Sequence, residues 1–235
     1  MTAADFSALD GVGLNRQAIF DLDALPVAMA SALRSRFDPA QRYRQLILIG
    51  HAGSVLWDSV KKSAERSAIA SENPIDDFSV GAVERWFAAQ SPGRVRQIIY
   101  PGDLPVGLQA LGKLAGWHHE SPFRVGVSAQ WGSWSAYRVV LLADTDFEPS
   151  LPEAGESPCA CCADQICIAS CPAGALAGGG FALDRCIAYR REPASRCAAT
   201  CIARVSCPVG AEHRYSEEQL RHSYSISLKM IERYC

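Results

Sequence analysis

The chain has 235 residues, a formal net charge of −2 and ten cysteines, and 49% of its residues are hydrophobic while 20% are charged. This composition excludes wholesale disorder, and without a positive excess there is no general electrostatic reason to bind nucleic acid. The sequence shows neither a secretory leader nor an apolar run of about 20 residues, so we expect a cytoplasmic protein that does not bind membranes.

The first 150 residues carry a mixed pattern of helices and strands. Helical periodicity predicts helices over Asn15–Ser35, Ser54–Ile69, Ser79–Ala89 and Leu104–Ala115. Short apolar runs predict strands over Tyr43–Gly50, Val95–Tyr100, Phe123–Ser128 and Tyr137–Asp144. Because strands alternate with helices, we predict an α/β or α+β sandwich domain over residues 1–150.

The composition changes after this region. Cysteine is absent before Cys159, and the segment Glu148–Pro158 contains three prolines, as expected of a linker. We therefore predict a second, cysteine-rich domain over residues 151–235. It would end in a helix over Tyr215–Cys235, where Ser216 and Gln219 fit a capping box.

Nine cysteines form two successive groups, and each group ends in Cys-Pro. At this density in a reducing compartment, cysteines indicate metal binding rather than disulfides. The pattern resembles the bacterial cluster run C-x2-C-x2-C-x3-C-P, whose fourth cysteine binds the other cluster. One cluster would take Cys162, Cys167 and either Cys171 or Cys207, and a crossed arrangement assigns Cys207 to it. The candidate ligands are Cys162, Cys167, Cys171, Cys186, Cys197, Cys201 and Cys207, with Cys159 or Cys161 as replacements for Cys162.

The spacings C-x4-C-x3-C-P and C-x3-C-x5-C-P are looser than the usual run. They are compatible with two [4Fe–4S] clusters, with one or with none. Zinc is the structural alternative because four thiolates suit a tetrahedral ion, and free or disulfide-bonded cysteines are another. Zinc sites usually contain C-x2-C pairs, which only Cys159 and Cys162 supply here, so we favour iron–sulfur clusters.

Polar residues in the first domain are candidates for catalysis. Asp103 is a candidate proton donor, and the alternative is that it caps the N-terminus of the helix that follows it. His118 suits proton transfer, or is a polar loop residue. His51 follows a strand end, where ligands often bind in α/β sheets. Arg138 interrupts an apolar strand and therefore needs a partner, which favours an anion-binding role.

The turn between the last two predicted strands contains two tryptophans. Trp131 and Trp134 flank Gly132, and their rings are suited either to a flat cofactor or to core packing. We treat these three residues, together with Arg138, as the candidate cofactor-binding set.

Several of these motifs resemble two known families. The chain resembles epoxyqueuosine reductases in four segments: Pro105-Val-Gly-Leu108, Gly132-Ser-Trp134, Cys171-Pro-Ala-Gly-Ala and Asp184-Arg-Cys-Ile-Ala-Tyr189. Cobalamin-processing proteins of the cblC type are similar in Asn73-Pro-Ile-Asp76, Gly132-Ser-Trp-Ser-Ala-Tyr-Arg138 and Arg214–Gln219. The resemblance implies a nitroreductase-like domain that binds cobalamin, followed by a ferredoxin-like iron–sulfur module.

The resemblance also implies a function. It suggests an oxidoreductase that takes electrons from a reduced ferredoxin or flavodoxin and delivers them to a corrinoid or to a small substrate bound with it. Arg138 matches an arginine that binds glutathione in the cblC type. The general-acid aspartate of epoxyqueuosine reductases is replaced by Gly102, with Asp103 one place later, so we do not expect a tRNA substrate.

Two other functions are compatible with the sequence. The first is a non-catalytic metal-binding or electron-carrier module that docks on a partner enzyme. The second is a flavin-dependent reductase on the same fold, which ranks below cobalamin because the sequence carries no flavin fingerprint.

Overall fold

The computed structural model describes residues 2–66 and 71–234. It divides into two compact units. The first contains Met1–Ala115 and Ala136–Glu153, and the second contains Gly116–Ser135 and Ala154–Cys235. Neither unit is a continuous stretch of chain. The boundary expected at residue 150 lies close to Glu153, where the chain passes from the first unit into the second for the last time. Residues Gly116–Ser135, however, are grouped with the cysteine-rich residues.

The first unit is built on a four-stranded sheet with the order β1-β2-β4-β3. Strand β1 (Arg16–Asp21) pairs antiparallel with β2 (Gln45–Ala52), and β3 (Arg96–Tyr100) pairs antiparallel with β4 (Ser135–Ala143). Every residue of β2 is buried. A central strand of this kind requires apolar layers on both faces of the sheet.

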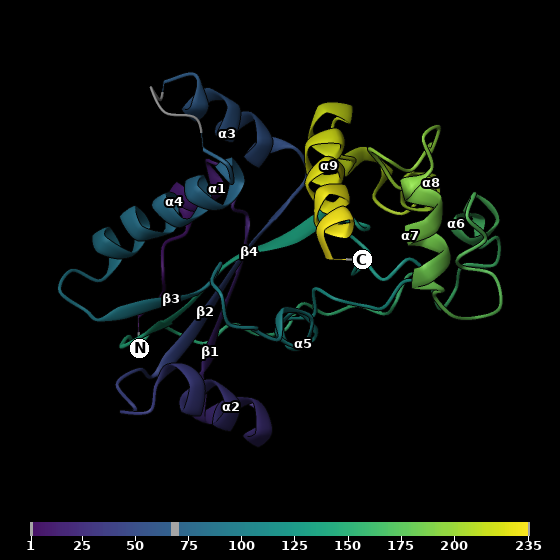
Figure 1. The fold of residues 1–235 in the computed structure, drawn as a ribbon. Coiled ribbons are helices and arrows are strands. Elements are labelled where there is room, and N and C mark those ends of the chain that lie inside the picture. Colours follow the sequence, from purple (N-terminus) through teal and green to yellow (C-terminus); the bar gives the residue numbers. More distant parts are fainter. Residues whose placement is uncertain (1, 67–70, 235) are drawn as a thin grey trace. The chain divides into compact units, whose positions relative to one another are not determined.

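Helices supply these two layers. Figure 1 shows α1 (Ser7–Asp10), α3 (Val55–Ala64) and α4 (Pro74–Gln90) on one side of the sheet. On the other side lies α2 (Val27–Phe37), which follows the short 3-10 helix η1 (Leu22–Ala24). Helix α5 (Leu108–Leu114) lies near β4, where Gly112 makes room for Tyr137: a Cβ at Gly112 would lie 1.8 Å from the tyrosine hydroxyl.

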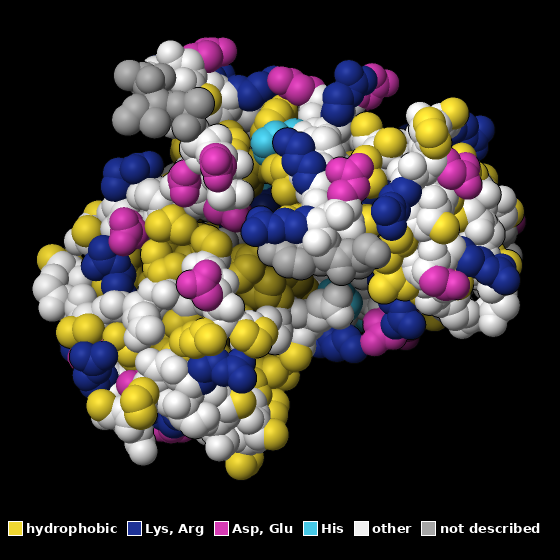
Figure 2. Space-filling view, viewed as in Figure 1, with side chains coloured by type: hydrophobic (Ala, Val, Ile, Leu, Met, Phe, Trp, Pro, Cys, Tyr) yellow, Lys and Arg dark blue, Asp and Glu magenta, His cyan; other side chains and the backbone are white. Residues whose placement is uncertain are grey.

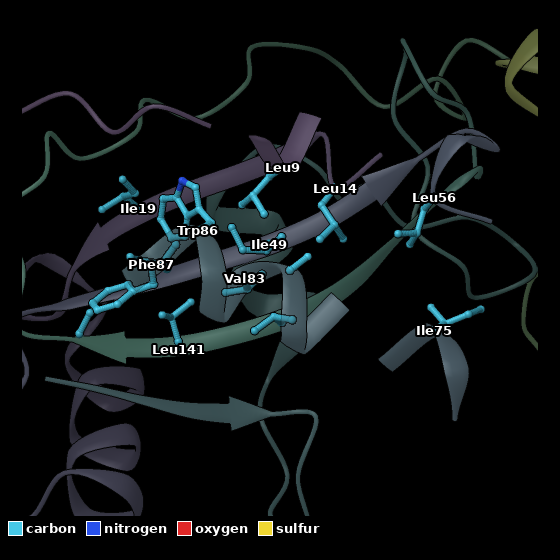
Figure 3. Packing of buried hydrophobic residues seen from close by; sticks show 14 of the residues in the cluster. Leu9, Leu14, Ile19, Ile49, Leu56, Ile75, Val83, Trp86, Phe87 and Leu141 are labelled. Atoms are coloured by element: carbon cyan, nitrogen blue, oxygen red, sulfur yellow. The ribbon is translucent and has the colours of Figure 1, made fainter. Parts of the chain in front are cut away.

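The main core lies between α4 and the sheet (Figure 3). Val83, Trp86 and Phe87 project from α4 towards Ile49 and Leu141 of the central strands. Trp86 also stacks on Phe6 at 5.0 Å between ring centroids, and its Nε1 donates to the Asp5 carbonyl. This packing ties the N-terminal segment to the helix layer.

The second unit contains several short helices and one long helix, joined by irregular loops. They are α6 (Ile166–Ala169), α7 (Leu183–Arg191), α8 (Ile202–Ser206), the 3-10 helix η2 (Ala211–His213) and the long terminal helix α9 (Glu217–Tyr234). Helix α6 packs on α8, and α7 packs on α9. At the start of α9 the Gln219 N–H donates to Ser216 Oγ at 3.2 Å, as expected of the predicted cap.

The predicted fold class is confirmed, and so are the strands predicted near residues 43–50, 95–100 and 137–144. The helix predicted over Asn15–Ser35 is wrong in its first half, which forms β1 against β2. Pro26, the residue before α2, prevents a helix from running through this segment because proline lacks an N–H and clashes with the preceding turn. The end of the predicted Ser54–Ile69 helix, beyond residue 66, lies outside the described residues, as does Cys235.

Three other element predictions need correction. The strand predicted over Phe123–Ser128 is absent: this part of the described chain forms only isolated bridges, His119 with Val127 and Ser128 with Gly132. Helix α4 starts at Pro74 rather than Ser79, because proline suits the first helical position. Helix α5 starts at Leu108 rather than Leu104.

The core between α4 and the sheet gives a first prediction. Phe87 is 0% exposed, so Phe87→Ala should lower the free energy of unfolding by about 3–5 kcal/mol through lost burial and a residual cavity. Val27, on α2, is 85% exposed, and Val27→Ala should change the stability by at most about 0.5 kcal/mol. Urea denaturation followed by circular dichroism measures both variants, and equal stabilities would contradict the described packing.

Candidate metal centre

The nine cysteines between Cys159 and Cys207 lie in the second unit, on its short helices and the loops between them. Cys167 lies within α6, Cys186 lies within α7, and Cys201 and Cys207 flank α8. A shared apolar core, in which Phe123, Leu176 and Ala203 are buried, packs around cysteines of both halves of the sequence. The short helices therefore bring thiols that are distant in sequence close together.

Four of these cysteines face one cavity. Cys159, Cys162, Cys167 and Cys207 line a space of about 50 Å³ together with apolar residues that include Phe123 and Val127. We call these cysteines the first thiol group. Burial raises the pKa of the Cys167 thiol, and Cys207 and Cys162 raise it further because of their proximity. Cys207 thus joins three cysteines from the other half of the pattern.

A second set forms around Cys186. Burial raises the pKa of Cys186, and neighbouring Cys201, Cys171 and Cys197 raise it further. We call these four cysteines the second thiol group. Cys171, which ends the first half of the sequence pattern, is therefore placed with three cysteines of the second half.

Cys161 belongs to neither set of four. It is exposed, its Sγ lies 3.6 Å from the Pro158 carbonyl, and it is absent from the lining of the cavity. The sequence alone left open which of Cys159, Cys161 and Cys162 face a cluster. The structure places Cys159 and Cys162 at the cavity and Cys161 at the surface.

A structural zinc ion would require four closely spaced thiols. A tetrahedral zinc ion bonded at about 2.3 Å would hold its four sulfurs about 3.8 Å from one another. Within residues 2–66 and 71–234, no three His, Cys, Asp or Glu side chains are grouped for a single metal ion. The described residues thus show four thiols at one cavity but no grouped site for a single ion, and the choice of iron–sulfur clusters over zinc stays a prediction.

The tryptophan turn packs against the cysteine-rich loops of the same unit. Gly132 has φ +57°, and a Cβ there would lie 2.0 Å from the Val209 carbonyl oxygen, just after Cys207. A Cβ at Gly210 would likewise lie 2.5 Å from the Gly132 nitrogen. Gly132 is therefore required for close backbone packing, and Trp131 lies against the His213 ring at 4.4 Å.

Trp134 is a core residue of the second unit. It is 0% exposed and packs edge-on against Tyr215. The guanidinium of Arg204 lies over its ring at 4.6 Å and bonds to Ser133. The burial of Trp134 favours the packing role over the cofactor-facing role that the sequence also allowed.

Of the candidate acid and base residues, Asp103 belongs to the first unit and His118 to the second. Asp103 is exposed in the loop before α5 and is not its N-cap, which is Gly107, so the capping prediction is wrong. His118 is 7% exposed and lies so close to Gly126 that a Cβ there would be 2.4 Å from its Nδ1. Neither residue is among those lining the cysteine cavity.

Arg138 lies in a polar cluster of the first unit. Its Nε donates to His51 Nδ1 at 2.9 Å, and its terminal nitrogen lies 3.9 Å from Asp76 on α4. Burial raises the pKa of Asp76, whereas the Arg138 charge lowers it. Arg138 is thus held in position by His51 and Asp76, with 15% of its side chain exposed.

Two functional candidates were not predicted from the sequence. Arg190 and Arg204 are buried beside cysteines of the second thiol group. Each follows a cysteine by about one helical turn, Cys186 and Cys201 respectively. This spacing is visible in the sequence, but arginines are usually exposed, and only the packing reveals their burial.

The fold combines a mixed α/β unit on a four-stranded sheet with a cysteine-rich helical unit, and its neighbours among solved structures have nitroreductase-like folds. No protein-family model matches the chain, and no curated protein matches it. Among solved structures, an epoxyqueuosine reductase from Bacillus subtilis matches with a TM-score of 0.56 at 14% identity, over 89% of this chain and 65% of that one.

Two further solved structures are similar. An epoxyqueuosine reductase with an epoxyqueuosine-modified tRNA-Tyr stem loop matches with a TM-score of 0.56 at 16% identity, over 91% of this chain and 66% of that one. A C. elegans B12-trafficking protein CblC matches with a TM-score of 0.52 at 14% identity, over 97% of this chain and 91% of that one. The chain thus spans slightly less than two thirds of the reductases, and these identities establish the fold alone.

One of these structures contains RNA, so the comparisons do not support excluding nucleic acid as a partner. On the face viewed in Figure 2, basic and acidic side chains are interspersed. In the described part of the chain, no helix is both long and apolar enough to cross a bilayer.

The packing of the tryptophan turn gives a second prediction. Gly132→Ala would place a methyl group against the Val209 backbone, so it should destabilise the second unit far more than Gly174→Ala. Gly174 is the matched control because its φ is +58° but a Cβ added there would meet no atom within 4 Å, leaving only about 1 kcal/mol of backbone strain. Urea denaturation and limited proteolysis compare the two variants, and equal losses would show that the turn is loosely packed.

Proposed function

We propose that the chain is an iron–sulfur oxidoreductase. The two thiol groups would hold one [4Fe–4S] cluster each and carry electrons to a corrinoid, or to a small substrate bound with it. The observation that carries this proposal is the exchange between halves: each thiol group contains three cysteines of its own half and the Cys-Pro cysteine of the other. This exchange characterises two-cluster ferredoxin modules.

The surroundings of the thiols fit such clusters. Phe123 and Val127 provide apolar walls beside the first thiol group and would limit the access of water. Burial raises the pKa of the Cys201 thiol, while a hydrogen bond from the Arg204 backbone N–H acts in the opposite direction. Hydrogen bonds to sulfur and solvent exclusion are two of the means by which proteins set cluster potentials.

The chemistry supplied by the bound clusters is one-electron transfer. A reduced protein donor of the ferredoxin or flavodoxin type would provide the electrons. The chain's own residues would position the groups and exclude water. In the first unit, Arg138 held by His51 and Asp76 offers a fixed positive charge for an anionic group of the substrate.

A corrinoid is favoured over a flavin as the acceptor. The support is the fold similarity to a B12-trafficking protein over nearly the whole chain, together with the sequence motifs shared with the cobalamin-processing family. An electron carrier without a cofactor site is the competing function, and cofactor binding separates the two.

Metal analysis tests the cluster part of the proposal. Anaerobically reconstituted protein should contain about eight iron and eight sulfide per chain. Cys167→Ala and Cys186→Ala should each retain about four of each, because each removes a ligand from a different thiol group. Cys161→Ala is the matched control and should retain the full content, since its thiol lies at the surface.

Several outcomes would contradict the assignment. Zinc in place of iron in the reconstituted protein would indicate a structural metal site. Loss of a cluster in Cys161→Ala, with Cys159→Ala unaffected, would show that the ligands of the first thiol group are wrongly assigned.

Corrinoid binding tests the second part. Titration of cob(II)alamin into the protein, followed by absorption spectroscopy, should show saturable and stoichiometric binding. The Cys186→Ala variant should bind with similar affinity, because it removes only a ligand of the second thiol group. Absence of binding to cluster-loaded protein would favour the electron-carrier function.

A further inference from the structure

Two arginines are buried beside the second thiol group. Arg190 is 7% exposed and Arg204 is 8% exposed. Burial of a guanidinium is costly and is normally offset by a carboxylate. In the described residues, however, neither arginine forms an ion pair with a carboxylate; both bond to neutral oxygen atoms.

Arg190 is fixed between a cysteine loop and the terminal helix. It lies one turn after Cys186 on α7, and its Nε donates to the Cys197 carbonyl at 3.2 Å. Its other nitrogens donate to Ser227 Oγ at 3.0 Å and to the Tyr224 carbonyl at 2.9 Å, both on α9. These bonds hold the charge one helical turn from Cys186 and at the backbone of Cys197.

Arg204 approaches the same thiol group from α8. Its guanidinium lies between the rings of Trp134 at 4.6 Å and Tyr215 at 5.1 Å. It also hydrogen-bonds to the Tyr224 side chain and interacts with Cys201. Burial raises the pKa of Tyr224 to about 12, so this hydroxyl stays neutral near pH 7 and cannot neutralise the arginine.

The first thiol group has a different charge environment. Arg214 donates to the Cys207 carbonyl at 3.3 Å, as Arg190 does to Cys197, but Arg214 is exposed. Asp164, near Cys162 in the sequence, is exposed as well. Around the second group, Asp184, Arg185, Arg191 and Glu192 are exposed and of mixed sign. Water and salt screen exposed charges, so the buried pair makes the larger difference between the groups.

We propose that Arg190 and Arg204 are the counterions of the cluster in the second thiol group and hold its reduction potential above that of the cluster in the first. This inference rests on the proposed function. A cluster bound by four thiolates is anionic and gains one further negative charge when it is reduced. Nearby buried positive charge therefore favours the reduced state. The second cluster would be the first to accept an electron in a reductive titration.

Potentiometric titration followed by electron paramagnetic resonance tests this inference. The single-cluster variants Cys167→Ala and Cys186→Ala assign the signals. At a fixed potential, Arg190→Gln and Arg204→Gln should each lower the ratio of reduced to oxidised second cluster at least tenfold, which corresponds to about 59 mV for one electron. The first cluster should be unaffected.

The matched control is Arg214→Gln, which removes an exposed arginine that makes the same type of bond to a cysteine carbonyl. It should shift neither potential appreciably. Arg204→Lys retains the charge and should keep the potential near the native value, which separates the effect of charge from that of packing. If Arg204→Gln does not load iron, Arg190→Gln and the lysine variant still decide the question.

The outcomes separate this inference from the proposed function. Native protein that takes up no iron would overturn both. Two loaded clusters whose potentials are unchanged by Arg190→Gln and Arg204→Gln, or changed equally by Arg214→Gln, would overturn only the role of the buried arginines.

Discussion

The cysteine-rich unit depends on the exchange of Cys171 and Cys207 between its two halves. Each set of four thiols draws three cysteines from its own half of the pattern and one from the other half, so the loops of both halves must pack together to form either set. Short helices α6 to α8, the terminal helix α9 and a small apolar core hold these loops together. Burial and mutual repulsion raise the pKa of Cys159 and Cys167, so bringing the thiolates together costs free energy that a bound metal group offsets. Binding of the proposed clusters would thereby be coupled to folding in this part of the chain.

The sheet unit is stabilised in a different way. Its core between α4 and strands β2 and β4 is large and apolar, and it contains no cysteine. Polar groups enter it only where they are paired, as Gln45 is with Asp21, Thr145 and the Phe147 backbone. The cluster His51–Arg138–Asp76 follows the same rule, since each charged or polar group has a partner from a different element. The stability of the sheet unit thus comes from packing, whereas the proposed clusters would cross-link the loops of the cysteine-rich unit.

Much of this organisation could be predicted from the sequence. Continuous apolar runs identified β2, β3 and β4, whereas the crossed ligation that the Cys-Pro endings indicate stays a prediction. The segment forming β1 was assigned to a helix, because periodicity does not reveal that its strand is completed by pairing with residues 45–50. Phe123–Ser128 has the composition of a strand, yet it is irregular because Phe123 packs into the cysteine-rich core. The exposure of Cys161 and the burial of Arg190 and Arg204 depend on tertiary packing, which local patterns do not encode.

The grouping of Gly116–Ser135 with the cysteine-rich residues has a consequence for how this protein can be divided. A fragment cut at the proline-containing segment near residue 153 would carry all the cysteines. It would nevertheless lack Phe123 from the core, Trp134 from beneath Arg204, and the Gly132 backbone that meets Gly210. The cysteine-rich part is therefore not a ferredoxin appended to an α/β domain. This compact unit includes residues encoded before the last strand of the sheet, so an expressed fragment that contains the whole unit must begin at or before Gly116.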